Sequence, residues 1–289
     1  MKQTLLISLL CLCSMLASAQ TKKKPGGFNK GKANQADKFL DKQWWIGFKA
    51  GTNLTQAVPG TRYSITVPTN YSAGRTEKIY DAFNEAGSQA SLEVTFFYKG
   101  FSFSTQPTYR LSRFTYSNQL YWENSSGQLI LNYEHEQKTS YADVPLMVKY
   151  DITGNKLRPY IQAGIFYSFL INATKSVIGS GTDGTSGTIH EFSSEPIIVG
   201  AKDLFHKGYW GLMGGIGLDY NIGNIRVVLD ASYWKGMSNV TNTDNRYSNT
   251  RLAGIGEAMD DLKLKNIVIS AGCLFPLRFL SNDFKSLGK

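Results

Sequence analysis

The chain has little cysteine, little histidine and few long apolar runs. Two of its three cysteines, Cys11 and Cys13, lie in the N-terminal segment, so without that segment only Cys273 is left. An internal disulfide, on which many compact secreted folds depend, is then excluded. After the N-terminus no apolar run reaches the roughly 20 residues that a membrane-spanning helix needs. The fold must therefore be stabilised by hydrogen bonds between the backbones of neighbouring strands.

The N-terminus has the features of a secretory signal peptide. Lys2 supplies the positive end, residues 5–16 the apolar core, and Ala17 and Ala19 the small residues of a cleavage site. We expect cleavage after Ala19. The expected division of the chain is signal peptide 1–19, basic disordered periplasmic arm 20–43, barrel domain 44–280 and polar C-terminal tail 281–289.

The net charge of +9 arises largely from lysines in this arm. Such a run is either a solvated linker or a segment that binds anionic lipid or an acidic partner. Because a signal peptide directs the protein out of the cytoplasm, we expect no nucleic-acid partner.

Short and long connections alternate along the rest of the chain. Residues 98–101, 151–156 and 221–224 are tight turns, whereas 56–88, 117–128, 174–208 and 237–262 are long and polar. Outer-membrane barrels have this asymmetry, with short periplasmic turns and long outer loops.

Eight segments between these connections alternate apolar and polar residues with the period of a β-strand. They are residues 44–54, 91–98, 101–110, 143–150, 161–169, 210–220, 225–234 and 267–275. Alternation alone fits either a lipocalin-like soluble barrel, apolar inside, or a membrane barrel, apolar outside. The polar face is rich in glycine, which suits a crowded lumen. Aromatic residues gather at the strand ends like the girdles of membrane barrels: Trp44, Tyr98, Phe101, Tyr150, Tyr160 and Tyr220 at the turns, and Trp210, Tyr233 and Trp234 at the loops. We therefore predict an all-β, eight-stranded, antiparallel up-and-down transmembrane barrel.

The polar face carries charges that would point into a narrow lumen. They are Lys49, Glu93, Arg110, Lys149, Asp219, Arg226 and Asp230. Isolated buried charges are costly, so these side chains are expected to pair. Such a network is either a structural plug or the wall of a conducting path; the interior of an eight-stranded barrel favours the plug.

Residues 141–150, with the sequence YADVPLMVKY, resemble the PorT family of Bacteroidetes outer-membrane barrels, as do residues 158–164, 214–220 and 233–239. The similarity extends from about Trp44 to Phe279. The family's named member is associated with type IX protein secretion. The resemblance implies an accessory or scaffold barrel more than an enzyme or a general porin, with secretion machinery or other envelope proteins as partners beside the outer-membrane lipid.

No catalytic or metal site is expected, and no cofactor. The sequence Glu134-His135-Glu136 would place its carboxylates on one strand face and the histidine on the other, whereas useful metal sites need convergent ligands. A lipid or peptide hydrolase would need His135, His190 or His206 to meet a serine, and no nucleophile motif supports this.

Apolar residues also occur in the longest outer loop. Ile197, Ile198 and Phe205 either form a local lid over the barrel mouth or a surface for a partner protein. The predicted function is a non-enzymatic, PorT-like accessory barrel linked to protein secretion; the alternative is a narrow porin for small solutes.

Overall fold

A computed structural model describes residues 42–63, 78–124, 127–153, 156–184, 188–222, 225–247 and 258–277. The predicted signal peptide, most of the basic arm and the C-terminal tail lie outside these residues.

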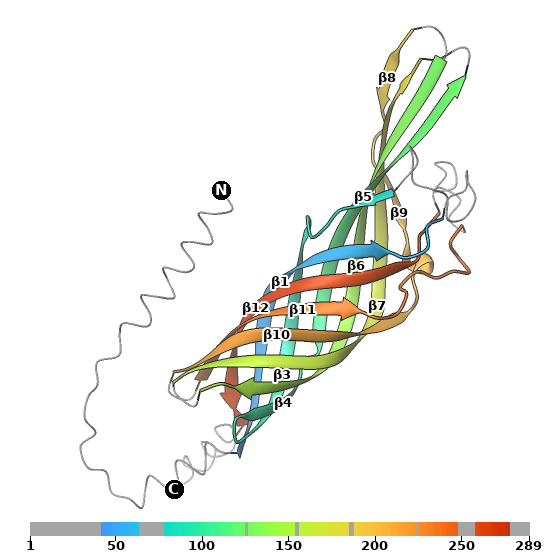
Figure 1. The fold of residues 1–289 in the computed structure, drawn as a ribbon. Coiled ribbons are helices and arrows are strands. Elements are labelled where there is room, and N and C mark those ends of the chain that lie inside the picture. Colours follow the sequence, from blue (N-terminus) through green and yellow to red (C-terminus); the bar gives the residue numbers. More distant parts are fainter. Residues whose placement is uncertain are drawn as a thin grey trace, which may run out of the picture. The chain divides into compact units, whose positions relative to one another are not determined.

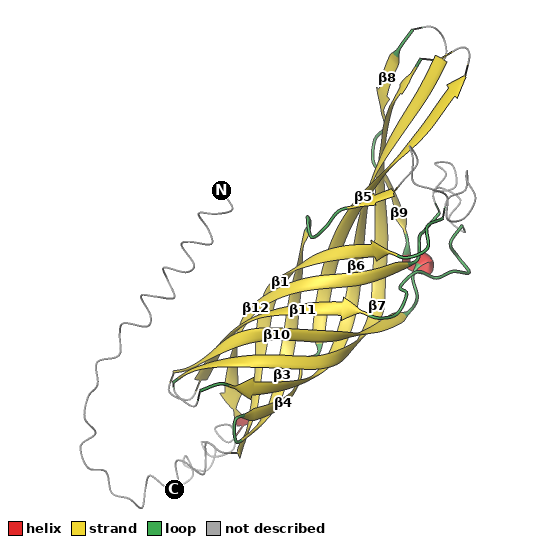
Figure 2. Ribbon diagram, viewed as in Figure 1, coloured by secondary structure: helices red, strands yellow, loops and turns green. Residues whose placement is uncertain are grey.

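The described chain is almost entirely strand (Figures 1 and 2). Its elements are β1 Lys42–Pro59, β2 Lys78–Tyr80, β3 Ala86–Tyr98, β4 Phe101–Thr105, β5 Thr108–Asn124, β6 Gly127–Asp151, β7 Leu157–Asp183, β8 His190–Ser193, β9 Ile197–Gly200, the 3₁₀ turn η1 Lys202–Leu204, β10 Gly208–Ile222, β11 Ile225–Gly236 and β12 Leu262–Pro276.

The strands close into an antiparallel ring. The first strand, β1, pairs with both β3 and β12, and β6 pairs with β7 on the opposite side. The strands β4 and β5 occupy one position in the ring, interrupted at Gln106-Pro107, because proline has no N–H to donate to a ladder. The ring thus has eight positions, which confirms the predicted barrel.

The strand ends that the predicted tight turns join lie at one end of the barrel, which also holds the start of β1 and the end of β12. Residues 154–155 and 223–224 of these turns lie outside the described residues. Tyr98 pairs with Phe101, so the β3–β4 hairpin has a two-residue loop. Its residues Lys99 and Gly100 have φ of 47° and 89°. Two successive positive φ values are typical of the type I′ turn, whose twist matches that of the strands.

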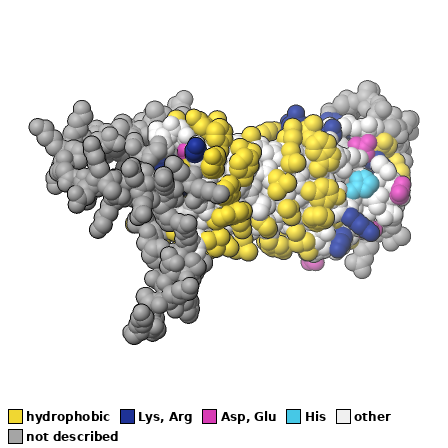
Figure 3. All heavy atoms as spheres, turned by 90° about the horizontal axis from the view of Figure 1, so that it is seen from below, with side chains coloured by type: hydrophobic (Ala, Val, Ile, Leu, Met, Phe, Trp, Pro, Cys, Tyr) yellow, Lys and Arg dark blue, Asp and Glu magenta, His cyan; other side chains and the backbone are white. Residues whose placement is uncertain are grey.

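The outer face of the barrel is apolar, as predicted. Phe48, Leu92 and Ile216 are 59%, 62% and 65% exposed, values that in water would leave a large unfavourable apolar surface. On the face seen in Figure 3, hydrophobic side chains form a broad band across the described surface, and charged side chains gather mainly toward its ends. We call the apolar outer surface the apolar belt. Among the described residues, no helix is long and apolar enough to cross a membrane.

The longest strands continue far beyond this belt, where the sequence predicted loops. Residues 117–124 and 174–183, predicted as loop, belong to β5 and β7, and β6 already begins at Gly127. We call residues 115–124, 127–139, 174–183 and 190–193 the blade, the sheet at the upper end of Figure 1. Thirteen blade residues of β6 extend roughly 40 Å at about 3.3 Å per residue.

A bulge separates the blade from the barrel. Ser140 pairs with Asn172 and Tyr141 with Leu170, so β7 contains one extra residue, Ile171. A bulge bends a strand and locally increases its twist. It also exchanges the faces of β7: Phe166 and Leu170 point inward before it, and Ala173 and Val177 after it.

Candidate functional site

The interior of the barrel is filled by charged side chains from many strands. The seven predicted lumen residues come from β1, β3, β5, β6, β10 and β11, and each is at most 5% exposed. The two-residue period of the strands is what directs them inward.

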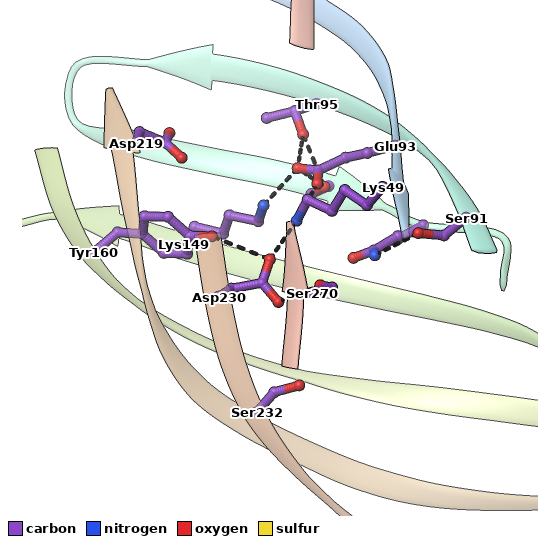
Figure 4. Close-up of polar contacts among 12 residues, drawn as sticks. Lys49, Ser91, Glu93, Thr95, Lys149, Tyr160, Asp219, Asp230, Ser232 and Ser270 are labelled. Carbon is purple, nitrogen blue, oxygen red and sulfur yellow. Dashed lines mark hydrogen bonds and ion pairs between the residues drawn. The ribbon is translucent and has the colours of Figure 1, made fainter. Parts of the chain in front are cut away.

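Four of these residues form a central layer: Lys49, Glu93, Lys149 and Asp230 (Figure 4). Lys49 Nζ lies 2.6 Å from Glu93 Oε2 and 2.5 Å from Asp230 Oδ2, so one ammonium bridges two carboxylates. Lys149 Nζ lies 2.5 Å from Glu93 Oε1. Two positive and two negative charges thus balance inside the barrel wall.

Neutral groups donate further hydrogen bonds to the two carboxylates. Thr95 Oγ1 donates a hydrogen bond of 2.7 Å to Glu93, and Ser104 Oγ one of 3.1 Å. Ser270 Oγ donates to Asp230 Oδ1 at 2.7 Å, and the Tyr160 hydroxyl to Oδ2 at 3.4 Å. A buried ion pair is tolerated when such hydrogen bonds complete its geometry.

A second layer lies toward the tight turns. Arg226 Nη1 is 3.1 Å from Asp219 Oδ2, and its guanidinium lies 4.2 Å from the centre of the Trp45 ring. Arg158 Nη1 is 3.4 Å from Asp151 Oδ2. This periplasmic layer is also neutral, and aromatic rings stabilise its buried guanidinium groups through cation–π contacts.

The third layer lies toward the outer mouth. Arg110 is fully buried and holds Asp143 with two hydrogen bonds, from Nε at 2.7 Å and from Nη2 at 3.0 Å. Arg110 Nη2 also donates to the Tyr209 hydroxyl at 2.8 Å. Such a two-pronged pair is the strongest geometry available to arginine and a carboxylate.

Sequence reasoning omitted three members of this network: Asp143, Asp151 and Arg158. Asp143 and Asp151 share the odd-numbered inward face of β6 with Lys149, so the period-two rule already placed them there. Both aspartates and the arginine are at most 8% exposed. With these three included, the charges of the ten residues in the three layers sum to zero: five cations and five anions.

Aromatic rings fill the space between the layers, and here two predictions were wrong. Tyr160 and Trp234, predicted in the outer girdles, point inward and are 1% and 4% exposed. Their partners explain this. A Cβ atom on Gly217 would lie 2.3 Å from the Tyr160 ring, so the ring occupies the space that the glycine leaves. Trp234 packs on Phe166 with ring centres 4.7 Å apart.

Loop residues cover the outer mouth of the barrel. Lys78 lies 3.1 Å from Asp260, and the Tyr80 hydroxyl donates to the same carboxylate at 2.8 Å. Arg246 Nη2 pairs with Asp261 at 2.6 Å. The contacts of Lys78 and Tyr80 join the first outer connection to the last one, and the Arg246–Asp261 pair braces the last connection internally; we call these contacts the cap.

The structure separates the three apolar residues of the longest outer loop. Ile197 and Ile198 are 36% and 66% exposed on β9, whereas Phe205 is 3% exposed and packs in the core near Leu204. Phe205 is therefore not available to a partner, and the surface at this place consists of the two isoleucines. A rim cavity of about 890 Å³ adjoins Phe205, with Lys202, His206 and Asn242 among its lining residues.

The histidines lie in separate surroundings. His135 is buried at the base of the blade, stacked on Tyr116 at 4.4 Å and 2.7 Å from Asn118 Oδ1. Its neighbours Glu134 and Glu136 lie on the other face of β6, as predicted. His190 lies at the exposed end of β8, with Nε2 3.0 Å from Thr188 Oγ1.

Residues 19–242 match the family described as outer membrane protein beta-barrel domain. No curated protein matches the chain. Among solved structures, Neisserial surface protein A is similar at 12% identity and a TM-score of 0.32, covering 80% of this chain and 96% of its own. Outer membrane protein W of E. coli is 14% identical with a TM-score of 0.30, covering 80% and 97%. The outer membrane protease OmpT of Escherichia coli is 9% identical with a TM-score of 0.28, covering 81% and 96%.

The matched segment includes seven of the eight ring positions, from β1 through β11. It covers well over half of the 289 residues. The chain therefore belongs to the outer membrane protein beta-barrel domain family, and its place is the outer membrane.

Proposed function

We propose that the protein is a non-conducting, non-enzymatic accessory barrel of the PorT type, which serves protein secretion through its outer surface. The observation that carries the proposal is the lumen. Three neutral layers of paired charges cross it, in a barrel whose interior is just wide enough for its own side chains.

Passage through this interior would require the pairs to separate. Removing the partner of a buried charge costs roughly 3–5 kcal/mol, because the charge that is left is uncompensated. The central layer alone has three ion pairs of 2.6 Å or less, so an open state would be rarely populated. Function is therefore assigned to the parts outside the wall.

The blade is the part best placed to meet other envelope proteins. Its sheet ends in the short edge strand β8, whose four residues are all exposed. An exposed strand edge offers backbone groups to a partner strand. Ile197 and Ile198 extend the exposed apolar surface of the same sheet along β7.

The proposal is tested by deleting the gene and measuring the export of surface proteins and the integrity of the envelope. Complementation then compares the full chain with a chain whose hairpin is shortened by removal of residues 119–132. Asn118 and Tyr133 are paired, so a two-residue Asn-Gly turn can join them. We expect the shortened chain to insert into the membrane but not to restore export. Normal export without the protein, or full rescue by the shortened chain, would contradict the proposal.

The second candidate is a narrow porin for small solutes. The polar inner wall supports it, because water-filled barrels have polar interiors. A hydrolase is a distant third candidate, and a His135→Ala variant with unchanged hydrolytic activity of the membrane fraction would dismiss it.

A further inference from the structure

Three lysines gather on the outer face of β11 and β12 at the loop end of the barrel. Lys235 and Lys265 are direct partners across the two strands, and Lys263 follows on the same face of β12. Lys235 and Lys263 are exposed and Lys265 is partly exposed. Like charges directly opposite each other destabilise an antiparallel pair, so this arrangement has a cost within the protein.

The neighbouring strands do not neutralise the three lysines. Gln56 and Val58 of β1 face Lys265 and Lys263, and Leu212 of β10 faces Lys235. No ion pair joins these lysines to a carboxylate in the described part of the chain. The outer surface here thus carries three uncompensated positive charges.

The height of the cluster relative to the membrane is defined by the residues below it. Tyr233 on β11 and Ile267 and Ile269 on β12 are the next outward residues toward the tight turns. From there each strand continues with outward residues that are mostly apolar, as far as Ile225 and Phe275. Such a row of about five outward residues suits a tilted strand across the hydrocarbon. The ammonium groups therefore lie at the headgroup level of the outer leaflet, which long lysine side chains reach readily.

Another part of the rim has a different arrangement. Arg113 on β5 and Lys138 on β6 also point outward, but both face Glu136, at 3.9 Å and 3.1 Å. Arg113 and Lys138 thus share a carboxylate of the protein, whereas Lys235, Lys263 and Lys265 pair with none among the described residues. The contrast provides an internal control.

We infer that Lys235, Lys263 and Lys265 form a binding site for the phosphate groups of an outer-leaflet lipid. Phosphate oxygens would relieve the repulsion between Lys235 and Lys265, and the acyl chains would lie on the apolar face below. The occupant is a lipid and not free phosphate, because only a lipid uses both the ammonium groups and the adjoining Tyr233, Ile267 and Ile269.

The test uses the full chain, refolded in a non-ionic detergent and titrated with diphosphorylated lipid A, with its dephosphorylated form and with inorganic phosphate, under native mass spectrometry. The variant is K235Q/K263Q/K265Q. The matched control is R113Q/K138Q, and K235R/K263R/K265R retains the charge. Heat-dependent gel mobility verifies that each variant is folded.

Each lysine near an anionic surface contributes about a fivefold gain in affinity, so the triple glutamine variant should bind the diphosphorylated lipid on the order of a hundredfold more weakly. The arginine variant and the R113Q/K138Q control should bind like the natural chain. Equal binding by the triple glutamine variant would overturn the inference, as would equal binding of the dephosphorylated lipid. Displacement of the lipid by millimolar inorganic phosphate would also overturn it, since the site would then recognise the free anion.

Discussion

The central layer of the lumen makes a quantitative prediction for Lys49. Its ammonium is within 2.6 Å of both Glu93 and Asp230, and its side chain is fully buried. The Lys49→Met substitution fills a similar volume but leaves two carboxylates with Lys149 as their nearby cation. An uncompensated charge of this kind costs roughly 3–5 kcal/mol of unfolding free energy. The hydrogen bonds from Ser270 and Tyr160 to Asp230 favour the lower end of this range.

The double variant K49M/D230N separates charge balance from packing. It removes one charge of each sign and leaves the Lys149–Glu93 pair intact at 2.5 Å. Each single variant, by contrast, leaves the layer with one unit of net charge. The double variant should therefore lose less unfolding free energy than the two single variants lose together, by at least about 1.5 kcal/mol.

Urea unfolding of the barrel in lipid vesicles, followed by tryptophan fluorescence, measures these free energies. The control is Lys138→Met, which removes a lysine whose pair with Glu136 is exposed, and which should change stability by less than about 1 kcal/mol. The reasoning fails if K49M is within about 1 kcal/mol of the natural chain, or if the effects of K49M and D230N simply add.

Three further predictions concern the wall and the outer surface. Gly217→Ala should destabilise the barrel by about 1–3 kcal/mol, because the new methyl group meets the Tyr160 ring. In the control Gly214→Ala the nearest neighbour of the new methyl group is 3.8 Å away, so stability in urea should change little. Equal effects of the two substitutions would contradict this packing. Phe205→Ala should lower the unfolding free energy by about 3–5 kcal/mol because the ring is buried. The variant I197A/I198A should leave stability nearly unchanged but reduce the recovery of partner proteins in co-purification, because both isoleucines are exposed. Unchanged recovery would show that the isoleucines are not part of a partner surface. Cys273 faces outward within the apolar belt, so a lipid-soluble maleimide should label it in intact vesicles and a charged maleimide should not; the reverse result would place it in water.

Much of this architecture is present in the sequence because a strand has a period of exactly two residues. Once the polar face was assigned to the lumen, Lys49, Glu93 and Asp230 followed as inward residues. Arg110 and Lys149 were placed by the same rule, and the structure brings all five into paired layers. The turn at Lys99-Gly100 was predictable because only these two residues separate two segments with strand alternation.

The remaining features depend on contacts that a period cannot supply. The bulge at Ile171 exchanges the faces of β7, so Ala173 and Lys175 point inward although the residues before them follow the opposite parity. Tyr160 and Trp234 were predicted in the girdles from their positions near strand ends. Both point inward, where Tyr160 fills the space beside Gly217 and Trp234 packs on Phe166. Residues 117–124 and 174–183 of the blade were predicted as loop because strands above the membrane have no lipid to face and therefore carry the polar composition of loops.

The central claim is that the barrel does not conduct. Single-channel recording of the refolded full chain in a planar lipid bilayer tests it most directly. We expect no steady openings, because three layers of paired side chains cross the lumen. Steady openings whose conductance changes when Arg226 or Asp230 is neutralised would contradict the account and establish a porin.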